Sequence, residues 1–201
     1  MFERAVIVLA AGLSSRMGDV NKLLIQINDT PMIRTTVSAY LEVSDAPVTV
    51  ITGFEHTNLE ASLAGLDVNF VHNPEYASGQ KTSVAAGLRA VPDAKSTIIA
   101  LGDQPLLNAS VIQDLLRTHE KSDQKRITIP MNNDARGNPL VIPHALKLRL
   151  LQDRDNPGCR KFTTDNPDFV NTFTTQNPAF FTDIDTPIDL QSFRARSERP
   201  T

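Results

Sequence analysis

The fold of this chain is decided by the stretch Val6-Ile7-Val8-Leu9-Ala10-Ala11-Gly12-Leu13-Ser14-Ser15-Arg16-Met17-Gly18, which Lys22 follows four positions later. The apolar, β-branched start predicts a buried strand, and the small residues after it predict a loop at the strand's end. Glycine and alanine let a backbone come close to a ligand, and consecutive loop N–H groups can point at an anion. With a serine hydroxyl, a guanidinium and an ammonium nearby, the loop is suited to a polyphosphate.

The spacing of this loop excludes two familiar phosphate-binding motifs. A P-loop has Gly, four residues and then Gly-Lys-Ser/Thr, whereas five residues separate Gly12 from Gly18. The dinucleotide fingerprint G-x-G-x-x-G is absent too, because Ala10 and Ser14 stand two positions either side of Gly12. The loop therefore belongs to another class of phosphate binder.

Composition limits what the chain can be. Its 201 residues suffice for one domain, and the formal net charge of −3 leaves no broad basic field, so we expect no nucleic-acid partner. No apolar run approaches the ~20 residues of a membrane-spanning helix, so we expect no membrane partner either. The single cysteine, Cys159, fits a reducing compartment and a cytoplasmic location, as a partly buried residue rather than a nucleophile.

Strand-like and helix-like segments alternate along the first half of the chain. We predict strands at Ala5–Leu9, Val48–Thr52, Val68–Val71 and Thr97–Leu101, and helices at Pro31–Leu41, Asn58–Leu63, Thr82–Ala90 and Ser110–His119, the last capped by Asn108. In the second half we predict strands at Ile127–Pro130, Pro139–Ile142, Phe169–Phe173 and Ala179–Asp183, and helices at Pro143–Leu151, Gly158–Thr164 and Pro187–Arg194.

This order predicts an α/β protein. It would be a single-domain three-layer sandwich, with a mostly parallel sheet and helices on both faces. One domain would cover residues 1–201, with a regular first half over about 1–108 and a less regular second half over about 109–195. Ligands of such sheets bind at the carboxyl ends of the strands, where the glycine loop and Asp103 both fall.

Two acidic segments have the chemistry of a metal site. Leu101-Gly102-Asp103-Gln104-Pro105 ends a buried strand, and a carboxylate there could hold Mg²⁺, although a turn or helix cap would explain the same residues. Later, Phe181-Thr182-Asp183-Ile184-Asp185-Thr186-Pro187 precedes a predicted helix. Strand alternation would put Asp183 and Asp185 on the same side, while Asp185 or Thr186 could instead cap that helix.

Taken in order, the motifs resemble the nucleotidyltransferases with the molybdopterin-nucleotidyltransferase-like fold. The matching elements are L-A-A-G-x-S-x-R-M-G with a following lysine, Asn73-Pro74 with Gly79 and Ser83, Gly102-Asp103-Gln104-Pro105, Arg136-Gly137-Asn138-Pro139 and Asp183-Ile184-Asp185-Thr186-Pro187. They span nearly the whole chain. An ordinary turn or cap would account for the Asn73 or the Arg136 segment alone, but not for the ordered set.

The resemblance implies a Rossmann-like nucleotidyltransferase fold, with a nucleotide-binding half over about 1–108 and an acceptor half over about 109–195. It also assigns roles to individual residues. Catalysis would fall to Arg16, Lys22 and Asp103, acceptor binding to Arg136 and Asn138, and Mg²⁺ to Asp103 and Asp185. Nucleotide-binding residues would be Leu9, Ala10, Ala11, Gly12, Ser14, Arg16, Lys22, Asn73, Gly79 and Ser83. The stretch Asn156-Pro157-Gly158-Cys159-Arg160-Lys161 departs from the family's acidic pattern, so only Arg160 is carried over from it.

Ala11, where the guanylyl branch has a second glycine, resembles the cytidylyl branch. The implied reaction joins CMP from CTP to a molybdopterin-type phosphorylated acceptor and releases pyrophosphate, and a molybdoenzyme could receive the product. Three alternatives stay open: a transferase using GTP or another nucleotide on a pterin, sugar or alcohol phosphate; a non-catalytic cofactor carrier; and a Rossmann-type oxidoreductase, which the missing fingerprint disfavours.

Overall fold

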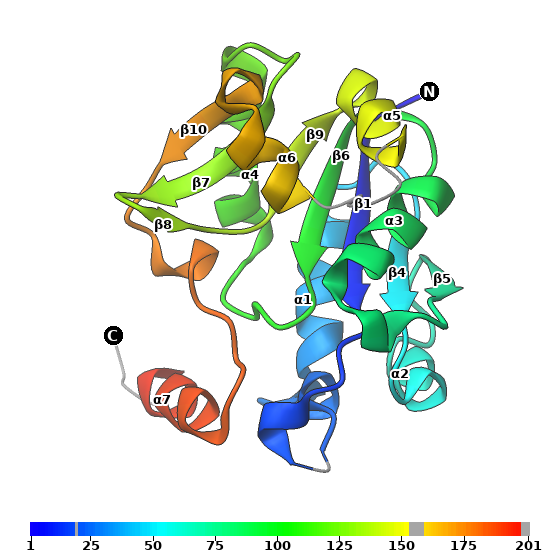
Figure 1. The fold of residues 1–201 in the computed structure, drawn as a ribbon. Helices are drawn as coiled ribbons and strands as arrows, with labels where there is room; N and C mark the ends of the chain where they lie inside the picture. Colours follow the sequence, from blue (N-terminus) through cyan, green and yellow to red (C-terminus); the bar gives the residue numbers. More distant parts are fainter. Residues whose placement is uncertain (19, 153–158, 198–201) are drawn as a thin grey trace.

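In the computed structural model of the protein, which describes residues 1–18, 20–152 and 159–197, strand β1 (Phe2–Ala10) lies in the middle of an eight-stranded sheet (Figure 1). The strand order is β10 (Val170–Thr174), β7 (Ile127–Asn132), β9 (Leu140–Pro143), β6 (Ala94–Leu101), β1, β4 (Val48–Thr52) and β5 (Val68–His72), with β8 (Ala135–Arg136) paired to β7. One sheet thus runs through both halves of a single domain.

The sheet is parallel except around β9 and β8. β1 pairs in parallel with β4 and β6, β4 with β5, and β7 with β10, whereas β9 runs antiparallel to both β6 and β7. Because β9 is reversed, its first residue, Leu140, lies opposite Ile99 near the end of β6. The residues just before β9 therefore reach the same sheet edge as the carboxyl ends of β1 and β6.

Helices cover both faces, as a three-layer sandwich requires. Side chains of β1 alternate: Val6 and Val8 pack among α1 (Met32–Leu41), α2 (His56–Ser62), α4 (Ala109–Lys121) and α7 (Pro187–Ser197). Ile7 and Leu9 pack on the opposite face, among α3 (Gln80–Ala90), α5 (His144–Gln152) and α6 (Cys159–Asp165). No helix within the described residues is long and apolar enough to cross a membrane.

Most predicted elements are confirmed, with ends that shift by a few residues. The hairpin of β2 (Gln26–Ile27) and β3 (Thr30–Pro31) was not predicted. Its turn residues Asn28 and Asp29 have φ of 49° and 60°, the left-handed pair that tight hairpins use. Pro31 consequently ends β3 and immediately precedes α1 instead of lying in its first turn. Short 3₁₀ turns complete the chain at Ser15–Met17, Lys22–Leu24, Tyr76–Ser78, Pro167–Phe169 and Pro178–Phe180.

The predicted strand at Ala179–Asp183 is wrong. Pro178 begins a 3₁₀ turn in which Asn177 Oδ1 accepts the N–H of Ala179 at 3.0 Å and Phe180 is buried. Proline holds φ near about −65° and Asn177 caps the first free N–H, so the chain turns here instead of extending. The strand-alternation argument for Asp183 and Asp185 fails with it, although both side chains still face the same cleft. Gly158, the predicted start of the sixth helix, lies outside the described residues.

Candidate active site

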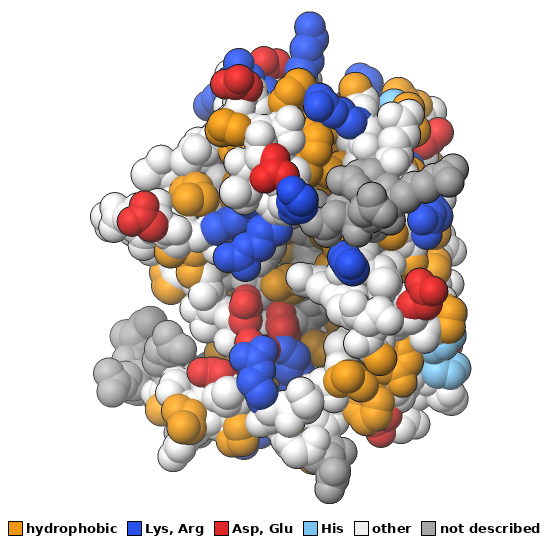
Figure 2. Space-filling model, viewed as in Figure 1, with side chains coloured by type: hydrophobic (Ala, Val, Ile, Leu, Met, Phe, Trp, Pro, Cys, Tyr) orange, Lys and Arg blue, Asp and Glu red, His pale blue; other side chains and the backbone are white. Residues whose placement is uncertain are grey.

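A cleft of about 1290 Å³ opens where the carboxyl ends of β1 and β6 meet the start of β9. Figure 2 shows this hollow with acidic side chains at its centre and basic side chains on either side. Of the residues predicted from the sequence, it brings together Leu9, Ala11, Gly12, Ser14, Arg16, Lys22, Gly79, Ser83, Asp103, Arg136, Asn138 and Asp185. The cleft thus collects segments that are far apart in the chain.

Ala10 and Asn73 do not line the cleft. Ala10 is 1% exposed and points to the opposite sheet face from Leu9 and Ala11, as alternation along a strand requires. Asn73 is buried beneath the lining, where its Nδ2 donates to Ser83 Oγ at 2.9 Å. Any contribution that these two residues make to ligand binding is therefore through the residues they support.

The glycine loop is held in shape by its own polar groups. Ser14 is left-handed, with φ 52°, and its Oγ accepts the N–H of Lys22 at 3.2 Å and donates to Asn21 Oδ1 at 3.4 Å. Asn21, 2% exposed, also accepts the N–H of Leu23 and donates to the carbonyl of Phe54. Asn21 was missed in the sequence, although an Asn before a helical turn is a common cap.

Lys22 lies between the two carboxylates that were predicted as metal ligands. Its Nζ contacts Asp103 Oδ2 and lies 2.6 Å from Asp185 Oδ1, and Arg16 lies 2.9 Å from Asp185 Oδ2. Burial pushes the pKa of Lys22 down, but the charges and hydrogen bonds of Asp103 and Asp185 together outweigh it, so that pKa is raised. Lys22 is therefore a permanent cation at neutral pH.

The fit of a divalent cation can be judged from Asp103. Its Oδ1 is buried and has no hydrogen-bond partner within the described structure, so one carboxylate oxygen is left for another ligand. No group of three or more His, Cys, Asp and Glu residues among those described could hold a metal ion by itself. Mg²⁺ commonly takes one or two carboxylates and completes its shell with phosphates and water, so this oxygen-donor set suits it.

Asp183 is a third carboxylate in the cleft, and its contact with Gln104 was not predicted. Gln104 is fully buried and donates through Nε2 to Asp183 Oδ1 at 2.7 Å and to the carbonyl of Phe180 at 3.4 Å. Burial, and then the neighbouring charge of Asp103, raise the pKa of Asp183 to about 6. The N–H of Ile184 also donates to the carbonyl of Asp103 at 3.0 Å. These bonds fasten the turn after β6 to the segment before α7.

The start of α7 settles which residue caps it. Thr186 Oγ1 accepts the N–H of Asp189 at 3.2 Å, and Asp189 Oδ2 accepts the N–H of Thr186 at 2.8 Å. This reciprocal pair is a capping box. Because Thr186 is the cap, the side chain of Asp185 remains available to the cleft.

One wall of the cleft is built on the turn before α3. Asn73 Nδ2 donates to Thr82 Oγ1 and Ser83 Oγ, both at 2.9 Å. Gly79 has φ 106°, a backbone conformation that residues other than glycine rarely adopt. Tyr76 and Lys81 also line the cleft here and were not predicted. The motif N-P-x-x-x-x-G-x-x-x-S therefore fixes the conformation of the turn that forms this wall of the cleft.

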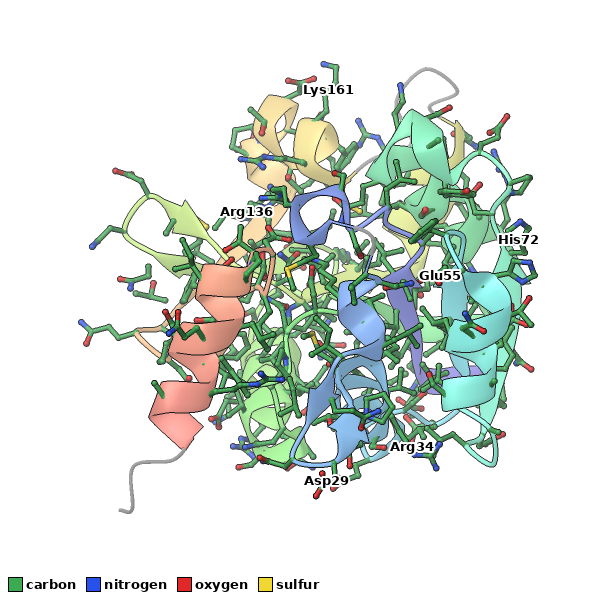
Figure 3. The ribbon with its side chains drawn as sticks, turned by 90° about the horizontal axis from the view of Figure 1, so that it is seen from below. Asp29, Arg34, Glu55, His72, Arg136 and Lys161 are labelled. Carbon is green, nitrogen blue, oxygen red and sulfur yellow. The ribbon has the colours of Figure 1, made fainter. Side chains whose placement is uncertain are left out.

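Another wall of the cleft, formed by residues of β8 and α6, is basic. Arg136, on β8, donates through Nη1 to Thr163 Oγ1 of α6, and burial lowers the pKa of its guanidinium. Gly137 lies against the chain: a Cβ there would meet the carbonyl oxygen of Phe180 at 2.6 Å. Arg160 and Lys161 line the same wall, and Figure 3 shows Arg136 and Lys161 on one side of the molecule. Lys161 had not been predicted.

Cys159 lines the cleft without the properties of a nucleophile. It is 5% exposed, and burial raises the pKa of its thiol to about 12. A thiol reacts as thiolate, so this group is inert at neutral pH. Its place as a buried small residue is confirmed.

Comparison with known proteins agrees with this architecture. The model of the MobA-like NTP transferase domain matches residues 6–169. Molybdenum cofactor cytidylyltransferase of Escherichia coli K12 is 25% identical over 191 residues, 94% of this chain and 95% of that protein. A probable molybdenum cofactor guanylyltransferase of Natronomonas pharaonis is 28% identical over 130 residues, covering 65% of this chain and 62% of the relative.

Among solved structures, a nucleotidyl transferase from Methanothermobacter superposes with a TM-score of 0.82 at 24% identity, over 96% of this chain and 97% of the other. That likeness shows the Rossmann-like fold. The family match covers most of the chain and includes the glycine loop, Lys22 and Asp103. The chain belongs to the MobA-like NTP transferase family and is a nucleotidyltransferase by descent.

Proposed function

We propose that the protein transfers CMP from CTP to a molybdopterin-type phosphorylated acceptor and releases pyrophosphate. The observation that carries the proposal is the meeting of Lys22 with Asp103 and Asp185 beside the glycine loop. A lysine ammonium and two carboxylates beside the glycine loop suit a metal-bound triphosphate. The full-length similarity to a cytidylyltransferase supports CTP as the donor.

The reaction needs no covalent enzyme intermediate. An oxygen of the acceptor's terminal phosphate attacks the α-phosphorus of CTP, and the bond to the bridging oxygen breaks, so pyrophosphate leaves with the electron pair. Backbone N–H groups of Gly12 to Ser14 and the guanidinium of Arg16 would hold the β- and γ-phosphates. Lys22 would offset the charge that develops at the α-phosphate. Catalysis then comes from positioning and charge, not from a nucleophilic side chain.

Asp103 and Asp185 would hold Mg²⁺, with Asp103 Oδ1 as the oxygen that lacks a partner. When bound, the cation would offset charge on the phosphate oxygens and on the leaving pyrophosphate. On the opposite wall, Arg136 and Asn138 would bind the acceptor phosphate, with Arg160 nearby. Because Nη1 of Arg136 donates a hydrogen bond to Thr163 Oγ1, the guanidinium is oriented before any ligand binds.

The experiment is acceptor-dependent release of pyrophosphate from CTP or GTP, with molybdopterin-type cofactor and Mg²⁺. We expect release only when acceptor is present, and faster with CTP. A preference for GTP would overturn the choice of base and keep the nucleotidyl transfer. Tight binding of the finished dinucleotide with no pyrophosphate release from any nucleotide would overturn the enzyme and indicate a carrier.

A further inference from the structure

Two basic residues already hold the carboxylates that the proposed function gives to a divalent cation. Lys22 contacts Asp103 and lies 2.6 Å from Asp185 Oδ1, while Arg16 lies 2.9 Å from Asp185 Oδ2. The side chains of Lys22 and Asp103 are 12% and 16% exposed, so water and salt screen their pairing weakly. The third carboxylate, Asp183, is held by the neutral amide of Gln104 and stands outside this pairing.

Charge balance then decides which ligand can enter. A metal ion alone could reach the unpartnered Oδ1 of Asp103, but to contact Asp185 as well it would have to displace Lys22 or Arg16 from that carboxylate. A triphosphate alone would place its negative charges beside Asp103 and Asp185. If the two arrive together, each charge finds an opposite partner: the carboxylates contact the cation, and Lys22 and Arg16 contact phosphate oxygens.

We propose that Lys22 is an internal counter-ion that occupies the metal site until a nucleoside triphosphate arrives, so that metal and nucleotide enter by an exchange of ion-pair partners. The proposal rests on the proposed function only for the class of ligand, a metal-bound triphosphate; it holds for any base and any acceptor. Coupling between two ligands typically changes affinity about 5- to 150-fold, and equally in both directions.

The test is the affinity of the nucleotide-free protein for Mn²⁺, measured from the electron paramagnetic resonance signal of free Mn²⁺. Lys22→Met should bind Mn²⁺ at least about tenfold more tightly than the wild type, because the substitution removes a positive charge that lies against the carboxylates of Asp103 and Asp185. Lys81→Met is the matched control. Lys81 is exposed in the same cleft and forms no described ion pair with Asp103 or Asp185, so its loss should change the affinity less than about twofold.

CTP should then raise the Mn²⁺ affinity of the wild type by a larger factor than that of Lys22→Met. The affinity of CTP itself for Mn²⁺ is common to both proteins, so the difference reports the exchange. The proposal is overturned if Lys22→Met binds Mn²⁺ no better than the wild type, or if Lys81→Met gains as much. Should Lys22→Met not fold, Arg16→Met serves, because Arg16 is 67% exposed; it should show a smaller gain, and no gain would contradict the exchange.

Failure of this proposal and failure of the proposed function are distinguishable. The nucleotide-free comparison involves no base and no acceptor, so it can succeed in a protein that prefers GTP. Conversely, the protein could join CMP to the acceptor while Lys22→Met binds Mn²⁺ no more tightly than the wild type. The proposed function would then stand, and the exchange of ion-pair partners would be overturned.

Discussion

Asp103 brings several functions of the site into one residue. Its Oδ2 contacts Lys22, its Oδ1 is buried without a described partner, and its carbonyl accepts the N–H of Ile184. An Asn variant replaces one carboxylate oxygen with an amide NH₂ and removes the negative charge. The hydrogen bond between the backbone of Asp103 and the N–H of Ile184 is not altered by this change. This makes Asp103→Asn a clean test of the carboxylate.

We predict that Asp103→Asn lowers pyrophosphate release by about 100-fold or more, because a preorganised charge is lost at the reacting phosphates. The melting temperature should stay close to that of the wild type. Asp114→Asn, which changes an exposed acid on α4, is the control and should keep full turnover. A normal rate for Asp103→Asn at low Mg²⁺ would remove Asp103 from the metal site.

His119 is buried against β7. Its side chain belongs to a residue that is 5% exposed, and its Nδ1 lies 2.7 Å from Thr128 Oγ1. Burial lowers the pKa of His119. Below about pH 6.5, where a histidine in the unfolded chain gains a proton, the unfolded state binds more protons than the folded state. The free energy of unfolding should therefore fall as the pH drops below that point.

Urea denaturation at several pH values checks this. His119→Gln should lose part of the pH dependence, whereas His72→Gln, at an exposed position, should follow the wild type. An unchanged pH dependence in His119→Gln would show that this histidine does not contribute.

At the scale of elements, the site depends on a junction between the turn after β6 and the segment before α7. Gln104 is the side chain that makes it, with Asp183 and the carbonyl of Phe180 as acceptors. Gln104→Leu keeps a similar shape and removes the donor, leaving both acceptors without that bond. We predict a loss of about 1–3 kcal/mol in the free energy of unfolding, together with a higher Mg²⁺ requirement for turnover.

Gln113→Leu, at an exposed position of α4, is the matched control for denaturation and for the Mg²⁺ titration. If the two leucine variants lose the same stability and need the same Mg²⁺, the junction does not position the carboxylates.

Much of the fold could be predicted from the sequence because periodicity and strand ends are local signals. The strands β1, β4, β5 and β6 and the cap at Asn108 are examples, and the cap is confirmed by the 3.0 Å bond from the N–H of Val111. The predicted strand at Ala179–Asp183 is wrong because the apolar residues after Pro178 are buried in a 3₁₀ turn. Composition alone does not distinguish a buried turn from a short buried strand.

Cleft residues could be predicted only where they belong to a motif of consecutive residues. Arg136 and Asp185 were found in this way, and the structure places both in the cleft. Gln104 was missed because its role depends on Asp183, which lies far along the chain. Asn21 had a local signal as the cap of the following turn, but its bond to the carbonyl of Phe54 had none. No local pattern records such a contact.

In the whole molecule, the reversed strand β9 brings residues from both halves of the chain to one edge of the sheet. β1 and β6 end at this edge with the glycine loop and Asp103, while β9 begins there, directly after Arg136 and Asn138. A fully parallel arrangement would carry those residues to the opposite edge. The fold thus places the glycine loop and a basic wall in one cleft.

We infer that this cleft holds a metal-bound nucleoside triphosphate between Lys22, Asp103 and Asp185. A crystal structure with CTP and Mn²⁺, in which anomalous scattering locates the metal, tests this inference. We expect one Mn²⁺ on Asp103 and Asp185, a triphosphate along the loop at Gly12, and Lys22 turned from the carboxylates to phosphate oxygens. Mn²⁺ bound elsewhere, or Lys22 still paired with both carboxylates beside bound CTP, would contradict it.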